Sequence, residues 1–226
     1  MLEVNRREFK YLVSPVQTAQ IARRLERVML PDPNNGADGY TVRSLYFDTL
    51  SDRDYTDKLN GYYQRRKIRL RSYGTDSTLK LELKEKQGDY QRKRSLLLTR
   101  PEAEQMQHGQ YGFLLARPEP LAQQLYTRLV TECYRPRCLV VYRRTAYYLR
   151  ENDTRVTFDS RVASSMTALD VFANAPLCPA FCSGQQTMEV KYRGFLLSSV
   201  KAALGTDLGM NESLGKYNAC RESWMH

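Results

Sequence analysis

The stretch Lys67-Ile68-Arg69-Leu70-Arg71 places a basic residue at every second position, with Ile68 and Leu70 between them. Residues two apart in an extended strand point to the same face, so this strand has one basic face and one apolar face. Four other stretches alternate in the same way: Arg6-Arg7-Glu8-Phe9-Lys10-Tyr11, Lys80-Leu81-Glu82-Leu83-Lys84, Arg155-Val156-Thr157-Phe158-Asp159 and Glu189-Val190-Lys191-Tyr192. The pattern predicts a sheet that closes around a charged interior and carries helices on its apolar side.

The rest of the chain predicts an α+β fold. Strand patterns cover residues 41–47, 64–73, 77–86, 92–98, 139–149, 155–159 and 187–192, and Gly74-Thr75-Asp76 is typical of a hairpin connection. Ser14-Pro15 predicts the start of a helix, and residues 101–132 have a helical period. A further helix is expected from Gly194-Phe195 to Leu204, ended by Gly205. Mostly antiparallel connections favour one domain over residues 1–226.

The net charge of +10, from 35 basic and 25 acidic residues, predicts an anionic partner. Nucleic acid, an anionic membrane surface and a phosphorylated small molecule all fit. The sequence contains no run of about 18 apolar residues, so no membrane span is expected. It also lacks, after Met1, the apolar segment that is typical of a signal peptide. The five cysteines have C-x4-C and C-x3-C spacings, which are poor zinc signatures. Reduced thiols in the cytoplasm are the expectation.

Charge repulsion limits where the basic faces can lie. Arg69 and Arg71 are ~7 Å apart along one face, and their repulsion is about 2 kcal/mol at an effective dielectric of about 20. An enclosed face of this kind needs acids or a bound polyanion. One interpretation is an outer face in which Glu8 and Glu82 pair with nearby cations. The other is a phosphate site, because arginine forks bind phosphate oxygens bidentately and glutamates can serve a divalent metal.

Seven motifs also occur in the order found in a known family. They are Glu8-Phe9-Lys10-Tyr11, Ser44-Leu45-Tyr46-Phe47-Asp48-Thr49, Lys67-Ile68-Arg69-Leu70-Arg71, Glu82-Leu83-Lys84, Tyr142-Arg143-Arg144-Thr145-Ala146-Tyr147, Glu189-Val190-Lys191 and Gly215-Lys216-Tyr217. Together they resemble the VTC (vacuolar transporter chaperone) polyphosphate polymerase domain, a branch of the CYTH-like triphosphate tunnel metalloenzymes. The resemblance covers residues 6–224 and matches a stand-alone, soluble form of bacterial type.

The resemblance implies a closed antiparallel β-barrel whose basic tunnel binds triphosphate or polyphosphate together with Mn²⁺ or Mg²⁺. The residues that it assigns to catalysis and phosphate binding are Lys10, Arg69, Arg71, Lys84, Arg144, Lys191 and Lys216. Lys93 and Arg155 are expected as further phosphate ligands. Glu189 matches the metal-binding glutamate of the family, and Glu8 is the second metal candidate. Arg6 stands where the wider superfamily has a glutamate, as in the VTC branch, and Gly215 stands where that branch usually has serine.

The implied activity is polyphosphate synthesis from ATP. Two alternatives use the same tunnel, namely hydrolysis of triphosphate and polyphosphate binding without turnover, whereas nucleic-acid binding would need only the +10 charge. Tyrosine pairs such as Tyr62-Tyr63 and Tyr147-Tyr148 are expected to pack rather than to stack on RNA bases. Asp48 is expected to begin a turn, and Trp224 to anchor the end of the chain. Arg69→Ala is expected to abolish phosphate binding and leave the fold intact.

Overall fold

A computed structural model of the chain describes residues 6–74, 78–88, 90–181, 184–206, 208–209 and 215–224. The chain divides into two compact units. Unit 1 contains Met1–Thr41, Tyr142–Val162 and Phe181–Gly215, and unit 2 contains Val42–Val141, Ala163–Ala180 and Lys216–His226. The division falls within three strands, β3 (Tyr40–Asp48), β7 (Arg135–Leu149) and β8 (Thr154–Ser165). One domain over residues 1–226 stays a prediction.

The strands of unit 1 follow the order β1-β10-β8-β7, with β1 at Arg6–Val13 and β10 at Gln186–Arg193. The β1–β10 and β10–β8 pairs are antiparallel. Their register sets Glu8 opposite Lys191 and Lys10 opposite Glu189, so that the charged positions of both strands share one face. A short strand, β2 (Leu30–Pro31), pairs with β7.

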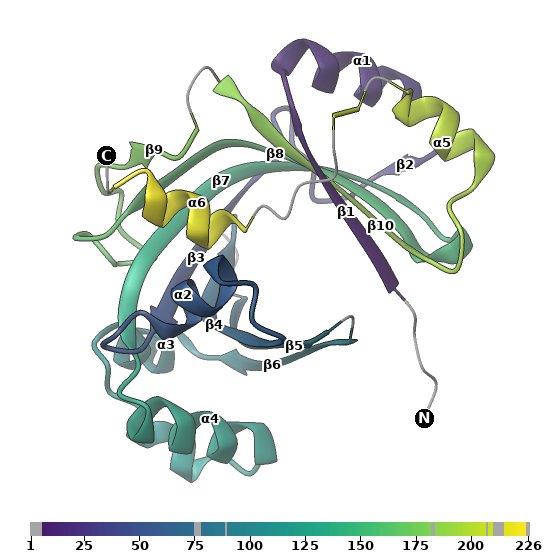
Figure 1. Cartoon of the computed structure of the whole chain (residues 1–226). Helices are drawn as coiled ribbons and strands as arrows, with labels where there is room; N and C mark the ends of the chain where they lie inside the picture. The colour runs from purple at the N-terminus through teal and green to yellow at the C-terminus, as the bar shows by residue number, and fades with distance from the viewer. Residues whose placement is uncertain are drawn as a thin grey trace. The chain divides into compact units, whose positions relative to one another are not determined.

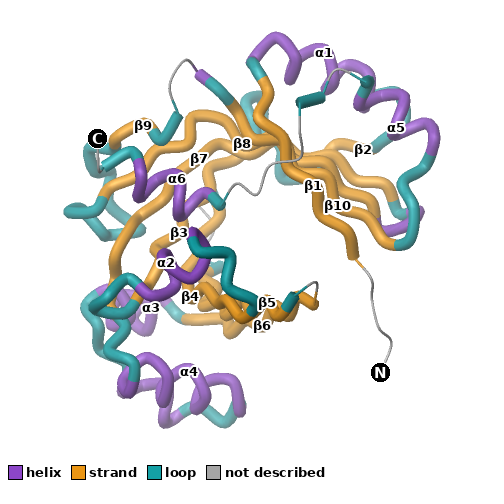
Figure 2. The backbone as a smooth tube through the Cα atoms, in the orientation of Figure 1, coloured by secondary structure: helices purple, strands orange, loops and turns teal. Residues whose placement is uncertain are grey.

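Helices α1 (Pro15–Leu25) and α5 (Ser198–Leu204) lie side by side in unit 1 (Figures 1 and 2). The α1 start is a capping box in which Ser14 Oγ accepts from Gln17 N at 3.1 Å and Gln17 Oε1 accepts from Ser14 N at 2.9 Å. The apolar strand faces and these helices form one buried cluster, which includes Val156, Val190 and Val200. A 3-10 turn, η2 (Glu151–Asp153), precedes β8.

The start of the helix predicted from Gly194-Phe195 to Leu204 is wrong. Gly194 has a φ of +66°, and Leu197 is extended at φ −59° and ψ 143°, so α5 begins at Ser198 and not at Gly194-Phe195. A left-handed glycine ends β10, and an extended segment follows before the helix. The predicted helix end is confirmed, because Gly205 caps α5 with a φ of 81°.

The strands of unit 2 follow the order β3-β4-β5-β6, with β4 at Gln64–Tyr73, β5 at Leu79–Gln87 and β6 at Tyr90–Leu98. Each neighbouring pair is antiparallel. The strand β9 (Cys178–Pro179) pairs with Ala163 and Ser164. The connection predicted at Gly74-Thr75-Asp76 lies mostly outside the described residues.

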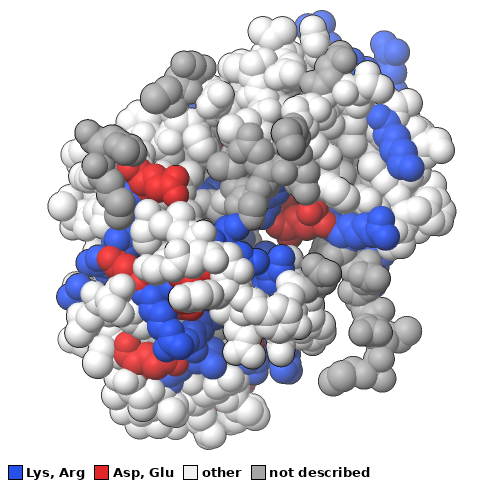
Figure 3. All heavy atoms as spheres, in the orientation of Figure 1, with Lys and Arg blue, Asp and Glu red and all other residues white. Residues whose placement is uncertain are grey.

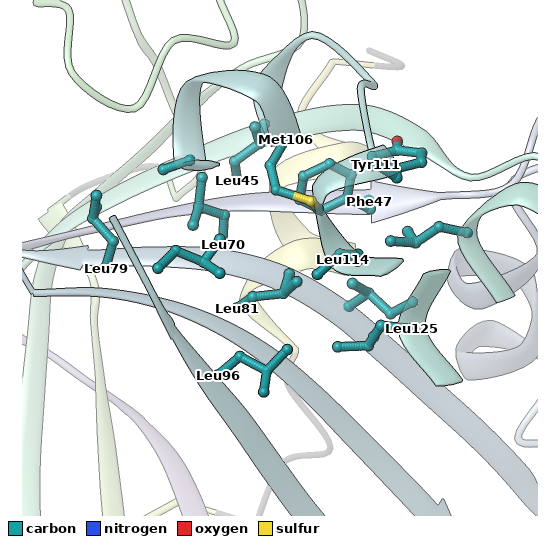
Figure 4. Packing of buried hydrophobic residues seen from close by; sticks show 14 of the residues in the cluster. Leu45, Phe47, Leu70, Leu79, Leu81, Leu96, Met106, Tyr111, Leu114 and Leu125 are labelled. Atoms are coloured by element: carbon teal, nitrogen blue, oxygen red, sulfur yellow. The ribbon is translucent and has the colours of Figure 1, made fainter. Parts of the chain in front are cut away.

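The apolar face of these strands is covered by helices. The helical region predicted over residues 101–132 consists of α3 (Arg100–Gln107), the 3-10 helix η1 (Gly112–Ala116) and α4 (Pro120–Thr131). Figure 4 shows strand residues such as Leu70 and Leu81 meeting Met106 and Leu114 from these helices. Two further helices are α2 (Arg53–Leu59) and α6 (Lys216–Glu222).

The predicted α+β class and the alternation that led to it are confirmed. Ile68, Leu70 and Leu81 are fully buried, while the charged residues between them lie on the opposite face. Across the described part of the chain, no helix is both long enough and apolar enough to span a membrane.

Candidate phosphate-binding site

Two lysines and two glutamates meet on the charged face of unit 1, where β1 pairs with β10. Lys10 Nζ lies 2.7 Å from Glu8 Oε1 and 3.8 Å from Glu189 Oε1. Lys191 Nζ lies 2.8 Å from Glu189 Oε2 and 3.7 Å from Glu8 Oε2. We call these four residues the lysine–glutamate square. Its charges balance, and each lysine contacts both carboxylates.

The two predicted arginines of unit 1 also have acidic partners. Arg144 donates to both oxygens of the buried Asp159, from Nε at 2.7 Å and from Nη2 at 2.8 Å. Burial alone lowers the pKa of Arg144, but Asp159 raises it well above the ordinary value. Arg155 Nη2 donates to Asp32 Oδ2 at 2.7 Å and to the Tyr40 hydroxyl at 3.2 Å. In unit 1 the predicted cations are therefore held in ion pairs.

The charged face of unit 2 has a different balance. Its residues form cross-strand rows over β4, β5 and β6, which we call the basic ladder. The rows are Arg65–Lys86–Gln91, Lys67–Lys84–Lys93, Arg69–Glu82–Ser95 and Arg71–Lys80–Leu97. Within these three fully described strands, Glu82 is the one acid on this face. On the face of the molecule that Figure 3 presents, basic and acidic side chains lie beside each other.

Glu82 is the buried centre of the ladder. Its Oε2 lies 2.6 Å from Arg69 Nε and 3.7 Å from Arg71 Nη1, and its Oε1 contacts Lys93 Nζ. Burial by itself raises the pKa of Glu82, but Arg69, Arg71 and Lys93 together lower it to about 2. The carboxylate is therefore ionised at neutral pH. Its ion pairs with these three residues show that Glu82 does pair with nearby cations, as one interpretation of the sequence expected.

This ion pair changes the expectation for Arg69→Ala. The guanidinium of Arg69 also donates to the Tyr46 hydroxyl at 3.0 Å, and Arg71 donates to Ser44 Oγ at 3.2 Å and to the Tyr73 hydroxyl at 3.2 Å. These contacts fix the two guanidiniums before any ligand binds. Removal of Arg69 takes one partner from a buried carboxylate, so we expect a loss of stability in addition to a loss of phosphate binding.

The row Lys67–Lys84–Lys93 contains three lysines directly opposite one another. Like charges in this position are unfavourable, and an anion bound between them relieves the repulsion. Lys67 was not among the predicted site residues, although its place in the alternating stretch is the signal that could have identified it. Its Nζ donates to Asn218 Oδ1 at 2.8 Å and lies 5.4 Å from the centre of the Tyr217 ring.

The C-terminal helix α6 therefore reaches the ladder. The Tyr217 ring stacks on Tyr46 with centroids 4.9 Å apart, and its hydroxyl donates to Asp48 Oδ2 at 2.7 Å. The predicted Lys216 is the first residue of this helix. Asp48 also accepts from the backbone N–H groups of Thr49, Asp54 and Tyr55, which confirms the turn interpretation.

The structure separates the three basic residues of β6. Lys93 lies on the basic ladder, but the register puts Arg92 and Arg94 on the opposite face. Arg94 Nη2 lies 2.9 Å from Glu85 Oε2 on that opposite face. Lys93 is therefore the member of this run that shares a face with Arg69 and Arg71.

The predicted roles of the aromatic residues have mixed outcomes. Tyr147 is buried as expected, but Tyr62 and Tyr63 are 56% and 66% exposed, so the packing interpretation is wrong for this pair. They precede β4 and so lie beyond the strand whose apolar face is covered. Trp224 Nε1 donates to Ser164 Oγ at 3.1 Å, which confirms the expected anchor.

The predicted metal ligands, Glu8 and Glu189, carry the carboxylate oxygens that a hard divalent cation prefers. Glu8 and Glu189 lie diagonally across the lysine–glutamate square, because the register sets Glu8 opposite Lys191 and Glu189 opposite Lys10. Mg²⁺ is usually bound through one or two carboxylates together with substrate phosphates. Over the part of the chain that is described, no three His, Cys, Asp or Glu side chains gather into a group able to hold a metal alone. Because two ammonium groups already neutralise the carboxylates, a cation without phosphate would meet repulsion.

The profile of the VTC domain family matches residues 5–225. The PH1819 protein from Pyrococcus horikoshii OT3 is similar in structure, with a TM-score of 0.50, 12% identity and coverage of 97% of this chain and 98% of that chain. A putative adenylyl cyclase from Hippeastrum, HpAC1, described as having a dominant triphosphatase activity, has a TM-score of 0.54 and 14% identity, with 95% and 94% of the two chains covered.

At these identities the two solved structures show a shared fold. A search of curated proteins finds no match. The family profile spans almost the whole chain and includes β1, the basic ladder and α6. The chain therefore belongs to the VTC domain family.

Proposed function

We propose that this protein binds triphosphate and polyphosphate and transfers phosphoryl groups, with polyphosphate synthesis from ATP as its reaction. The basic ladder is the observation that carries the proposal. On this face of β4, β5 and β6 one carboxylate, Glu82, shares the surface with eight cations: Arg65, Lys67, Arg69, Arg71, Lys80, Lys84, Lys86 and Lys93. A chain of contiguous phosphates is a ligand that supplies many negative charges to such a face.

For phosphoryl transfer, the protein mainly needs to position the reacting groups and to stabilise their negative charge. The loose transition state of phosphoryl transfer spreads negative charge over the equatorial oxygens, and cations fixed in advance stabilise it. Arg69 and Arg71 are fixed by Glu82, Tyr46 and Ser44, so little reorganisation is required when phosphate binds. A terminal phosphate is already ionised at neutral pH, so a general base is not needed. Lys216, Arg144 and Arg155 are proposed as further phosphate contacts.

Glu8 and Glu189 are the residues that would hold Mn²⁺ or Mg²⁺. The cation would neutralise charge on the phosphate oxygens. Because the lysine–glutamate square is already balanced, we expect Mn²⁺ to bind at least tenfold more tightly with tripolyphosphate than without it. Electron paramagnetic resonance of free Mn²⁺ measures this, with the Mn²⁺–tripolyphosphate mixture as control. Glu189→Gln should remove the Mn²⁺ binding that exceeds that of the Mn²⁺–tripolyphosphate mixture without protein. Tight Mn²⁺ binding without phosphate would contradict the assignment.

Polymerase and hydrolase activities differ in the nucleophile. The test is incubation with ATP and Mn²⁺, with and without a short polyphosphate primer, followed by measurement of ADP, phosphate and polymer length. Chain growth with equimolar ADP supports synthesis. Phosphate release without growth selects the triphosphatase alternative, which the activity described for the Hippeastrum protein favours as second candidate. Tripolyphosphate binding without turnover would reduce the function to that of a binding module.

The place of action is proposed to be the cytoplasm. Cys133, Cys138, Cys178 and Cys220 are free thiols, and such thiols persist in a reducing compartment. ATP, the proposed phosphoryl donor, is available there.

A further inference from the structure

Tyr63 comes directly before the first residue of β4 and continues the face of the basic ladder at that end of the strand. Gly88 N donates to the Tyr63 carbonyl at 3.0 Å, so the β4–β5 pairing continues past Gln64–Gln87. The alternation along β4 then gives Tyr63 the same side as Arg65, Lys67 and Arg69. An exposed aromatic ring therefore stands at the end of a row of cations.

The ring of Tyr63 rests on Gly88. A Cβ on Gly88 would lie 2.6 Å from Tyr63 Cε2, so the glycine leaves room for the ring to lie close to the turn. Gly88 also has a φ of +56°, a conformation that glycine adopts readily. The ring is supported on the side of the turn, yet 66% of the residue is exposed. Such a ring offers a flat apolar surface to a ligand.

The cations begin at the next row. Arg65 and Lys86 lie ~7 Å further along the face, and the three lysines of the row Lys67–Lys84–Lys93 lie ~7 Å beyond them. A ligand that fits this order has an aromatic group at one end and several phosphates in line with it. A nucleoside triphosphate has this form, whereas inorganic polyphosphate would leave the ring uncovered.

We propose that Tyr63 is the stacking platform for the base of a nucleoside triphosphate whose phosphates bind the basic ladder. This assignment rests on the proposed function, because it needs the ladder to bind phosphate. Stacking is tolerant of sequence but stronger for larger rings, so the platform gives a preference for purine over pyrimidine nucleotides. The platform would therefore distinguish the donor nucleotide, which has a base, from the polyphosphate product, which has none.

Titration calorimetry of ATP, UTP and tripolyphosphate tests the proposal with the full chain and three variants. Tyr63→Ala should weaken ATP binding about five- to tenfold, the lower part of the range for base–aromatic stacking. It should also reduce the preference for ATP over UTP and leave tripolyphosphate affinity within twofold. Tyr63→Phe keeps the ring and should bind ATP like the parent.

Tyr90→Ala is the matched control, because Tyr90 is 60% exposed but lies on the face of β6 opposite Lys93. It should leave all three affinities unchanged. Equal losses of ATP and tripolyphosphate affinity in Tyr63→Ala, or no loss of either, would overturn the platform. If the parent bound neither ligand, the proposed function itself would fail, and the two failures are therefore distinguishable.

Discussion

Glu82 is the residue on which the arrangement of the basic ladder depends. Its side chain is 1% exposed and contacts Arg69, Arg71 and Lys93. A carboxylate in this position holds cations together that would otherwise repel one another. It also competes with phosphate for the same guanidiniums. The same residue should therefore favour stability and limit affinity.

We predict that Glu82→Gln lowers the free energy of unfolding at pH 7 by about 3 kcal/mol, since it leaves partly buried cations unbalanced. The pKa of Glu82 is lowered from 4.5 to about 2 in the folded state, so its contribution is present above about pH 4.5 and is lost as the pH falls towards 2. Urea unfolding at pH 7 and at pH 2–4 should show the difference between parent and variant shrinking in acid.

Glu85→Gln is the control for this comparison. Glu85 pairs with Arg94 and Arg128 on the other face and is 30% exposed, so its loss should cost less. Tripolyphosphate should bind Glu82→Gln at least as tightly as the parent. Unchanged stability at pH 7, or weaker phosphate binding, would show that Glu82 does not hold the cations as described.

Among the elements, α6 is held by two acidic residues outside it, Asp48 through Tyr217 and Asp52 through Arg221. Arg221 is 3% exposed and donates to both oxygens of Asp52, at 3.0 and 2.7 Å, and Asp52 also accepts two bonds from Arg137. Burial raises the pKa of Asp52, but Arg221 and Arg137 lower it to about 2. The pair fixes the helix that carries Lys216 and that holds Lys67 through Asn218.

We predict that Asp52→Asn loosens α6. Asn tolerates the φ of 55° at this position, so the substitution removes the charge without backbone strain. We expect a stability loss of about 1–2 kcal/mol, after allowance for solvent screening at the partly exposed carboxylate. Trp224, the one tryptophan of the chain, lies two residues beyond α6 and reports the change as a red-shifted emission that acrylamide quenches more easily.

Acid should have the same effect on the parent protein. Because the pKa of Asp52 is lowered from 3.8, its stabilisation is present above about pH 3.8 and disappears as the pH falls towards 2. Asp57→Asn changes a carboxylate that pairs with Arg53 on α2 and should leave the emission of Trp224 unaltered. An unchanged spectrum in Asp52→Asn would mean that other contacts hold the helix.

For the whole molecule, general attraction of anions by the net charge of +10 must be distinguished from specific binding at the basic ladder. Attraction between a basic surface and duplex DNA depends on counterion release and weakens by about 10³- to 10⁵-fold between 50 and 200 mM salt for six to ten phosphate contacts. We predict that at 200 mM salt duplex DNA does not displace labelled tripolyphosphate. Fluorescence competition measures this, and displacement by DNA at that salt would favour the nucleic-acid interpretation.

The sequence predicted the two faces of each strand because apolar residues such as Ile68 and Leu70 alternate with charged ones at every second position. It could not predict register, since the meeting of Lys67, Lys84 and Lys93 depends on how three strands pair. It also missed Asp32, the partner of Arg155, because a loop composition says nothing about distant contacts. The exposure of Tyr63 likewise depends on its position beside the turn at Gly88, which residue type does not show.

The most direct test of the central claim is tripolyphosphate titration calorimetry of the parent, Lys84→Ala and Arg92→Ala. Both variants lose one positive charge, but Lys84 lies on the basic ladder and Arg92 lies on the opposite face of β6. Loss of a charge-assisted contact predicts at least tenfold weaker binding for Lys84→Ala and a change within twofold for Arg92→Ala. Equal weakening of the two variants, or no binding by the parent, would contradict a phosphate site on this face.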